Sequence, residues 1–455
     1  MNKLPKPIRF LASIRLAVII IIAMAILTAV GTIVEAQNDA EVAGALVYHS
    51  WYMYLTLGAL CVCLIAVMVD RWPWKPHHMG FVLAHIGILI LLFGAWLTKE
   101  FGIDGSMVFE IGQERKYVAV KEKDIAVYAS VEGTEVRPIF QQSVDFISQP
   151  PTPELPFVID VGSDKIEVLE YLHFAFRQSE MRASDKKMDG PAVRFQLQNP
   201  RVNLTEWLRL DMARPSSMTD LGPARVVIAS GDYAPSGHNE IVLRKTTQPN
   251  VLEVKIFNKD KSLRLTKLMK QGDLLQTGWM GLEFRLLRYL PHAHEVVTYS
   301  KAESHSPLAQ PAIRLKFLGN DYWLGLNSMM RLYEGQKMII ISYGQRQIEL
   351  PFALRLKEFK MDKYQGTQRA SSYESMVDVP GRGVVNISMN EPLYEGGYTF
   401  YQSSFEQDDS GKPVASILSV NHDPGRWIKY LGSFLICLGS IMLFYFKRMY
   451  FKKRG

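Results

Sequence analysis

Four long apolar runs constrain the fold of this 455-residue chain more than any other feature of the sequence. They cover residues 16–34, 51–69, 80–97 and 427–446. Each is close to the ~20 residues that a helix needs to cross the hydrocarbon core of a bilayer. The remainder is polar and rich in strand-like patterns, which excludes a disordered chain, a coiled coil and an entirely soluble enzyme. We therefore predict four transmembrane α-helices, three N-terminal and one C-terminal, with a large β-rich domain between the third and the fourth.

The basic residues predict the orientation of these helices. They flank the first run on its N-terminal side, lie between the second and third runs, and follow the fourth: Lys3, Lys6, Arg9, Arg15, Arg71, Lys75, Lys447, Arg448, Lys452, Lys453 and Arg454. The segment between the first two runs carries Glu35, Asp39 and Glu41 without Lys or Arg. The positive-inside rule then places both termini in the cytoplasm and residues 98–426 outside. Much of the net charge of +7 reflects this topology, so we expect no nucleic-acid partner.

The first run has an alternative interpretation as a cleaved signal peptide. Val34-Glu35-Ala36 loosely resembles a cleavage site, and the basic start fits. The apolar stretch is longer than a usual signal core, so we expect it to be retained as a helix. Cleavage would leave the remaining topology unchanged. The predicted regions are then residues 1–98, 99–426 and 427–455.

The distribution of cysteine limits the chemistry of the predicted exported domain. Cys61, Cys63 and Cys437 all fall inside predicted membrane helices. Residues 99–426 therefore contain neither a disulfide nor a C-x-x-C pair, which excludes thiol oxidoreductase activity by this domain. We also find no serine nucleophile motif, zinc-binding H-E-x-x-H or phosphate-binding glycine loop, so we assign no catalytic residue.

Residues 99–426 alternate between apolar and polar side chains with a period of two, which predicts a large antiparallel β assembly. It would form a sandwich or a barrel-like structure in one or two lobes, with a boundary near residues 210–225. Residues 291–311, with His292, His294 and His305, predict a long loop. His292 and His294 could share a strand face and hold a metal. Without a further ligand nearby in the sequence, we expect solvated histidines instead.

His85 is the only ionisable residue in the third apolar run. An ionisable side chain at membrane depth is costly and normally faces a partner, a cavity or a ligand. If the helix begins near Met79, His85 lies about 9 Å from its cytoplasmic edge. Histidine is a common metal ligand and an axial ligand of haem iron. The alternative is a neutral imidazole that is hydrogen-bonded to a neighbouring helix, and composition leaves both open.

Two further histidines lie at the cytoplasmic edge of the same predicted helix. His78 is two turns before His85 and on the same face, next to His77. The pair could form an entry station for a ligand that moves toward His85. We expect them instead to be interfacial side chains that extend toward water.

Glycines recur at intervals of seven in the third and fourth runs. Gly80, Gly87 and Gly94 form one stripe, and Gly432 and Gly439 form a second. Small residues let membrane helices approach closely, so we predict that these two helices pack antiparallel through the stripes. Residues 85 and 87 differ by about 200° around a helix, which would leave His85 pointing away from the contact.

At this point the sequence resembles the ResB (CcsB) family of the system II cytochrome c biogenesis pathway, over nearly the whole layout of the chain. Segments that carry the resemblance occur in the same order: Leu11-Ala-Ser-Ile-Arg-Leu-Ala, His85-Ile-Gly-Ile-Leu-Ile-Leu-Leu-Phe-Gly-Ala, Leu350-Pro-Phe-Ala-Leu-Arg-Leu, Asn390-Glu-Pro-Leu, Gly397-Tyr-Thr-Phe-Tyr-Gln-Ser-Ser-Phe405 and Asp423-Pro-Gly.

The resemblance implies a function. Such proteins pair with a CcsA (ResC) partner in the bacterial inner membrane. Together they move haem b outward and attach it through thioether bonds to the C-x-x-C-H thiols of apocytochrome c. The third-helix histidine of that family, an axial ligand of haem iron, maps onto His85, and its second ligand belongs to the partner. The tryptophan-rich haem-presenting loop also belongs to the partner. The resemblance thus implies a non-catalytic or co-catalytic subunit of a holocytochrome c synthase.

Three other functions compete with this interpretation. A transmembrane b-type electron-transfer protein needs two haem ligands per site, and this chain offers only His85 within its predicted helices. A transporter or sensor with His85 as a proton relay predicts further buried charges in several helices. A haem-free cell-envelope scaffold predicts no haem in the purified protein.

Overall fold

The computed structural model describes residues 5–452 except 132–134, 163, 186–188, 223, 304–305, 335–336, 367–369 and 409–411, and the side chains of residue 131 and of residues after 445 are not described. His305 lies outside the described residues. Two compact units make up the chain: one consists of Met1–Ala175 and Lys301–Gly455, and the other is Phe176–Ser300. The second unit is therefore an insertion into the first.

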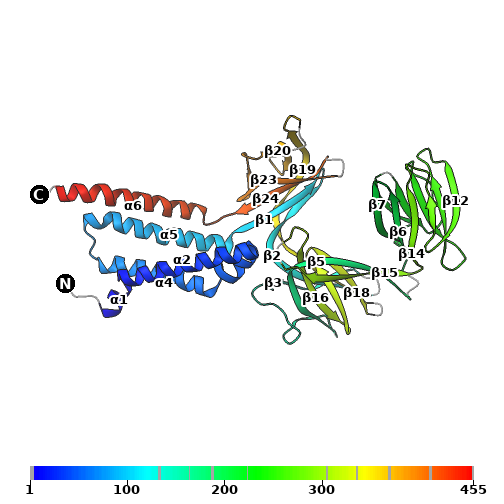
Figure 1. Ribbon diagram of the computed structural model, residues 1–455. Helices are drawn as coiled ribbons and strands as arrows, with labels where there is room; N and C mark the ends of the chain where they lie inside the picture. Colours follow the sequence, from blue (N-terminus) through cyan, green and yellow to red (C-terminus); the bar gives the residue numbers. More distant parts are fainter. Residues whose placement is uncertain are drawn as a thin grey trace. The chain divides into compact units, whose positions relative to one another are not determined.

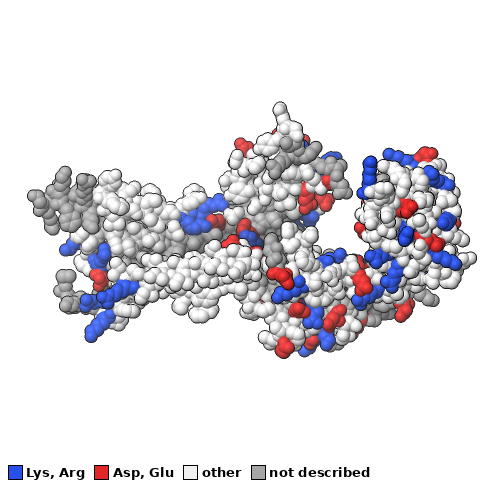
Figure 2. Space-filling view, in the orientation of Figure 1, with Lys and Arg blue, Asp and Glu red and all other residues white. Residues whose placement is uncertain are grey.

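Four helices of the first unit are long and apolar enough to cross a membrane: α2 (Ile14–Gln37), α4 (Trp51–Asp70), α5 (Met79–Phe101) and α6 (Arg426–Lys452). They lie side by side in Figure 1. Figure 2 shows that the helices present an almost uncharged surface between charged ends. The four helices and the large β-rich region identify a membrane protein, as the sequence predicts. The shorter helices are α1 (Lys6–Leu11), α3 (Ala40–Ala43), the π-helix η1 (Gly44–Tyr48) and the 3-10 helix η2 (Pro76–His78).

The serines before the long helices explain where two of them begin. The hydroxyl of Ser13 accepts a hydrogen bond from the Leu16 amide at the start of α2, and the hydroxyl of Ser50 accepts one from the Met53 amide at the start of α4. Each bond satisfies an amide that has no partner inside its helix.

A ten-stranded sheet dominates the first unit. Its strand order is β21-β20-β19-β2-β1-β24-β23-β22, with β18 added to β19 and β3 added to β2. The strands are β1 (Ile103–Glu110), β2 (Glu114–Val131), β3 (Arg137–Val144), β18 (Ser328–Glu334), β19 (Lys337–Lys363), β20 (Ala370–Val379), β21 (Gly383–Ser388), β22 (Leu393–Glu395), β23 (Tyr398–Gln407) and β24 (Pro413–His422). The long strands β2 and β19 contribute to two separate hydrophobic cores.

The other sheets have the orders β15-β5-β16-β17, with β4 added to β5, β13-β14-β6-β7 and β12-β11-β10-β9-β8. Their strands are β4 (Phe157–Asp160), β5 (Lys165–Ala183), β6 (Ala192–Asn199), β7 (Val202–Arg209), β8 (Ser216–Asp220), β9 (Arg225–Ala229), β10 (Glu240–Lys245), β11 (Val251–Phe257), β12 (Leu263–Lys270), β13 (Leu274–Gln276), β14 (Glu283–Leu290), β15 (Ala293–Lys301), β16 (Gln310–Phe317) and β17 (Asn320–Gly325). Every strand pair of these sheets whose register is described is antiparallel, apart from β9 and β10, which are parallel.

The second unit is a sandwich that the predicted lobe boundary at residues 210–225 would cut. Leu208 precedes that stretch, Leu210 is its first residue and Val226 follows it, yet all three belong to one core between two sheets. The prediction was wrong because the turn residues there connect strands of the same unit. The chain instead passes between the units within β5 and at the end of β15.

The predicted loop over residues 291–311 is also partly wrong, because Ala293–Lys301 forms strand β15. Ala293 and Tyr299 are buried, while His294 between them is exposed. The prolines on either side suggested a loop, but the intervening residues include consecutive β-branched side chains that favour a strand. His292 lies just before the strand, where its Nδ1 contacts the carbonyl oxygen of Asp189 at 2.9 Å.

The predicted antiparallel packing of the third and fourth helices is confirmed. A Cβ atom added to Gly80 would lie 2.8 Å from the carbonyl oxygen of Gly439, and one added to Gly87 would lie 2.7 Å from that of Gly432. A third pair extends the contact, since a Cβ on Gly94 would lie 3.1 Å from the Gly425 carbonyl oxygen. Only hydrogen at these positions allows the two backbones to approach this closely.

The helix pair continues directly into a strand pair. Helix α5 leads into β1, and β24 leads into α6, while β1 and β24 pair from Ile103 opposite His422. At the junction, Asp423 accepts hydrogen bonds from the Thr98 hydroxyl at 2.6 Å and the Lys429 ammonium at 2.8 Å. The position of α5 is therefore fixed by contacts along its length and at its C-terminal end.

Candidate functional site

His85 lies on α5, on the face opposite the glycine stripe that contacts α6. The imidazole is half-buried, and its Nδ1 lies 2.8 Å from the carbonyl oxygen of Phe81 one turn earlier. A carbonyl oxygen can only accept, so Nδ1 carries the proton in this contact. In the neutral ring Nε2 then has a free lone pair, which is the form that binds a metal.

An aromatic side chain packs against this imidazole, and a cationic side chain packs on that aromatic ring. The ring of Phe81 packs against it with a centroid separation of 3.8 Å and an interplanar angle of 37°. The guanidinium of Arg71, just after the end of α4, lies 3.7 Å from the centroid of the Phe81 ring. These three residues form a stack, which we call the Arg71–Phe81–His85 stack. It holds the imidazole in one orientation.

His77 and His78 lie in η2, next to each other, with ring centroids 4.1 Å apart. His78 Nδ1 accepts a weak hydrogen bond from the Lys75 amide at 3.4 Å. Seven residues separate His78 from His85, a rise of about 10 Å along the helix. Within the described part of the chain, no hydrogen bond joins His78 to His85. The sequence places both on one face, but the structure does not bring them together.

The described residues include no group of three or more His, Cys, Asp or Glu that could hold a metal ion. His85 by itself can therefore bind only a metal whose other ligands come from elsewhere.

A second polar cluster joins the segment between α2 and α4 to the β-rich part of the first unit. Asp39 accepts hydrogen bonds from the Val42 amide and from His173 Nε2, both at 2.8 Å. His173 Nδ1 lies 2.7 Å from the hydroxyl of Tyr171. We call these contacts of Asp39, His173 and Tyr171 the linker clamp. A cavity of about 490 Å³ beside it is lined in part by Glu41, whose carboxylate pairs with buried Lys123.

Sequence reasoning missed the linker clamp. In the sequence, Asp39 was used only as evidence for the membrane topology. Its partner His173 lies 134 residues away along the chain. Burial raises the pKa of Asp39, but the hydrogen bonds from the Val42 amide and the His173 imidazole outweigh burial, so this pKa lies below its ordinary value.

The depressed pKa of Asp39 predicts how pH acts on the clamp. The clamp contributes full stability above the ordinary carboxyl pKa near 3.8 and loses it as the pH falls through the lower, folded-state value. We expect Asp39→Asn to destabilise the protein at pH 7 by about 1–2 kcal/mol, since the hydrogen bond from His173 loses its charged acceptor. The free-energy difference between the two proteins should shrink below pH 4. Unfolding of the detergent-solubilised full chain by urea between pH 7 and pH 3 measures both effects.

The control for this prediction is Asp104→Asn, which removes one partner of an exposed ion pair with Lys121. Such pairs contribute little, so the change should lie within about 0.5 kcal/mol. Equal effects of the two substitutions, or an Asp39→Asn effect that does not change with pH, would contradict the clamp.

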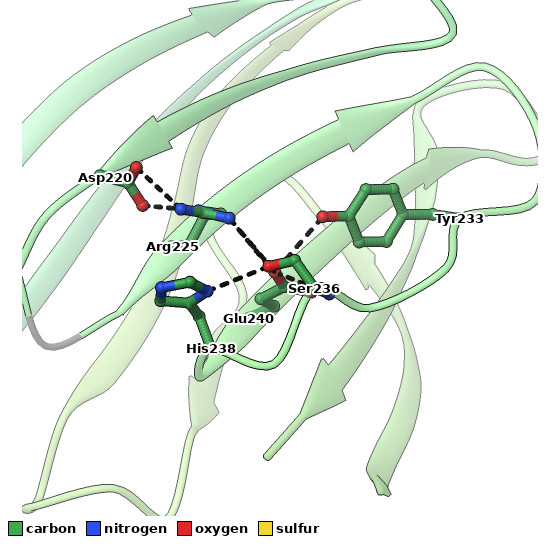
Figure 3. A network of polar contacts seen from close by, with 6 residues as sticks. All are labelled: Asp220, Arg225, Tyr233, Ser236, His238 and Glu240. Atoms are coloured by element: carbon green, nitrogen blue, oxygen red, sulfur yellow. Dashed lines mark hydrogen bonds and ion pairs between the residues drawn. The ribbon is translucent and has the colours of Figure 1, made fainter. Parts of the chain in front are cut away.

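A polar network in the second unit brings together six side chains (Figure 3). Glu240 is fully buried and accepts hydrogen bonds from the hydroxyl and amide of Ser236 and from the hydroxyl of Tyr233 at 3.3 Å. Arg225 donates two hydrogen bonds to Asp220, at 2.5 and 3.0 Å, and this guanidinium lowers the pKa of Asp220. Because these groups satisfy one another, the network fastens the segment between β9 and β10 rather than binding a ligand.

Comparison with known proteins adds to this geometry. Residues 315–417 match the model of the ResB-like family. A stretch of 106 residues is 40% identical to Protein NrfI of Wolinella succinogenes, covering 22% of this chain and 11% of that protein. This part of the chain is therefore similar to the ResB-like family. The segment that matches the family model runs from the end of β16 into β24.

Several residues that carry the family resemblance form a hydrophobic core. One hydrophobic core contains residues of β1 and β24, the first and last strands along the chain. Buried in the same core are Leu350, Leu354 and Leu356 of β19 and Phe400 of β23. In this part of the chain the resemblance therefore reflects the packing of the sheet. His85 lies outside the residues that match the family model, so the role assigned to it rests on the geometry of α5.

Proposed function

We propose that this ResB-like protein acts in cytochrome c biogenesis as the membrane subunit that binds haem through His85. The observation that carries the proposal is an imidazole on a long apolar helix, whose Nδ1 is engaged by that helix and whose Nε2 has no hydrogen-bond partner among the described residues. The glycine contacts place α6 on the opposite face of α5, so the imidazole faces away from the helix pair.

The residues fit haem better than a free metal ion. Porphyrin nitrogens occupy the equatorial positions of haem iron, so one imidazole is enough to hold it on one side. A flat apolar macrocycle also suits a site among membrane helices. We propose that the second axial ligand comes from a CcsA/ResC-type membrane subunit. His78, at the cytoplasmic end of α5, would lie on the path by which haem b enters.

In this proposal both termini face the cytoplasm of a bacterium, and residues 98–426 lie outside its inner membrane. Trp51 and Trp427 support the orientation of the helices relative to each other, since both are exposed and begin helices at the end where the strands are attached. Tryptophan is enriched at membrane interfaces. The division of the chain into residues 1–98, 99–426 and 427–455 follows from this topology and stays a prediction.

The partners outside the membrane would be apocytochromes c with reduced C-x-x-C-H thiols, to which the haem vinyl groups become attached. The exported region contains no cysteine, so it cannot form mixed disulfides with these thiols. This chain would act as a non-catalytic or co-catalytic subunit, because we assign it no catalytic residue.

Loss of this chain is expected to stop cytochrome c maturation in the bacterium that produces it. Cells without the gene should contain at least about tenfold less covalently bound haem in their c-type cytochromes, measured by haem staining after denaturing electrophoresis. The wild-type gene should restore the signal. A deletion strain with normal covalent haem and no second copy of the gene would refute the proposal.

A further inference from the structure

Arg71 is a cation whose hydrogen-bond donors have no acidic partner among the described residues. Its guanidinium lies over the Phe81 ring at 3.7 Å, and the residue is exposed. In the described part of the chain no salt bridge includes Arg71, although many other basic residues have one. The aromatic contact covers one face of the guanidinium and leaves its N–H edge available.

Phe81 connects this guanidinium to the candidate metal-binding nitrogen. Its carbonyl oxygen accepts the hydrogen bond from His85 Nδ1 at 2.8 Å, and its ring packs between the imidazole and Arg71. Phe81 therefore sets both the direction in which His85 Nε2 points and the position of the Arg71 guanidinium. The stack is built from two elements, the end of α4 and the first turns of α5, so it depends on the reversal of the chain between them.

A ligand that used both groups would need a metal for Nε2 and an anion at the cytoplasmic edge. Arginine presents a planar fork of donors that matches a carboxylate in a bidentate geometry. Haem combines these features, since it carries iron at its centre and two propionate carboxylates on one edge. No other basic side chain is seen in the stack, although Lys75, His77 and His78 lie nearby in η2 and the residue before it.

We propose that Arg71 is a positioning residue that binds a haem propionate when His85 coordinates the iron. The proposal rests on the haem-binding function proposed above. The propionate edge of haem then lies at the cytoplasmic end of α5. The vinyl groups, which occupy the other part of the macrocycle, point toward the exported side, where thioether bonds to apocytochrome c would form. Arg71 would thus determine which edge of haem faces the exported side when haem is passed to apocytochrome c.

The experiment compares haem b with its dimethyl ester, in which both propionates are uncharged. Each is titrated into the detergent-solubilised full chain and followed by the Soret absorption. We expect the wild-type protein to bind haem b at least about tenfold more tightly than the ester. Arg71→Gln should lower the affinity for haem b to that for the ester and leave the ester affinity unchanged. The Soret position, which reports ligation by His85, should stay the same.

Two variants separate a positioning role from a structural one. Arg71→Lys keeps the charge and should restore part of the preference for haem b. Arg15→Gln is the matched control, since Arg15 is an exposed cation in the first turn of α2 at the same end of the helices. It should leave the preference unchanged.

The outcomes distinguish this inference from the function on which it rests. Equal affinity of the wild-type protein for haem b and its ester would overturn the role of Arg71 alone. An equal loss of affinity for both compounds in Arg71→Gln would do the same. A wild-type protein that binds neither compound would overturn the proposed function together with the inference.

Discussion

Replacing Gly87 by leucine is expected to separate α5 from α6 and to leave little folded protein. The new Cβ would lie 2.7 Å from the carbonyl oxygen of Gly432 and 2.8 Å from the amide nitrogen of Ile436. Both atoms belong to the backbone, so the clash cannot be relieved by a side-chain rotation. Overpacking typically costs 1–3 kcal/mol, and we expect at least about 3 kcal/mol here because three more carbon atoms follow the Cβ.

The measurement is the yield of monodisperse protein in detergent, together with its thermal unfolding midpoint. The matched control is Gly58→Leu in α4, because a Cβ at Gly58 meets nothing within 4 Å. The same residue change in a neighbouring membrane helix should leave the yield and the midpoint near the wild-type values. If Gly87→Leu protein accumulates and unfolds like the Gly58→Leu control, the packing of α5 on α6 is wrong.

The four apolar helices and the packing of two of them could be predicted because both depend on local patterns. Length and hydropathy identify a membrane helix, and the seven-residue spacing of Gly80 and Gly87 identifies a stripe. The third contact escaped prediction because Gly425 precedes the predicted fourth helix, in the turn that begins at Asp423. Only the continuation of the helix pair into β1 and β24 brings Gly425 opposite Gly94.

The division of the β-rich region could not be predicted, since it depends on which strands share a core. Leu210 and Val226 flank a stretch that looks like a linker, yet they pack together in the second unit. The two passages between the units occur within strands, where no turn residue marks a boundary. No local sequence pattern distinguishes a strand that crosses from one unit to the other from a strand that stays within one unit.

The candidate site was predicted in part. His85 is found by its charge in an apolar run, and its position away from α6 follows from helical spacing. Arg71 and Phe81 were missed as neighbours because Arg71 contributed only to the charge count that sets topology. Their contact requires the chain reversal between α4 and α5, which the pattern of the sequence does not define. The linker clamp between Asp39 and His173 was missed for the same reason.

His85→Ala is the second substitution with a large expected effect. It removes the imidazole that would hold haem iron and leaves a gap beside Phe81 that added imidazole can fill. We expect the haem content of the protein, purified with the proposed CcsA/ResC-type partner, to fall at least about tenfold. The control is His49→Ala, an exposed histidine just before α4 and outside the Arg71–Phe81–His85 stack. This control should keep its haem.

The most direct test of haem binding by His85 is the absorption spectrum of these co-purified complexes, recorded with and without added imidazole. The account predicts a haem spectrum in the wild type that weakens in His85→Ala and recovers with imidazole. A spectrum that is unchanged in His85→Ala would contradict ligation by His85 and leave the imidazole a packing group. Absence of haem from the wild-type complex would contradict the proposed function as a whole.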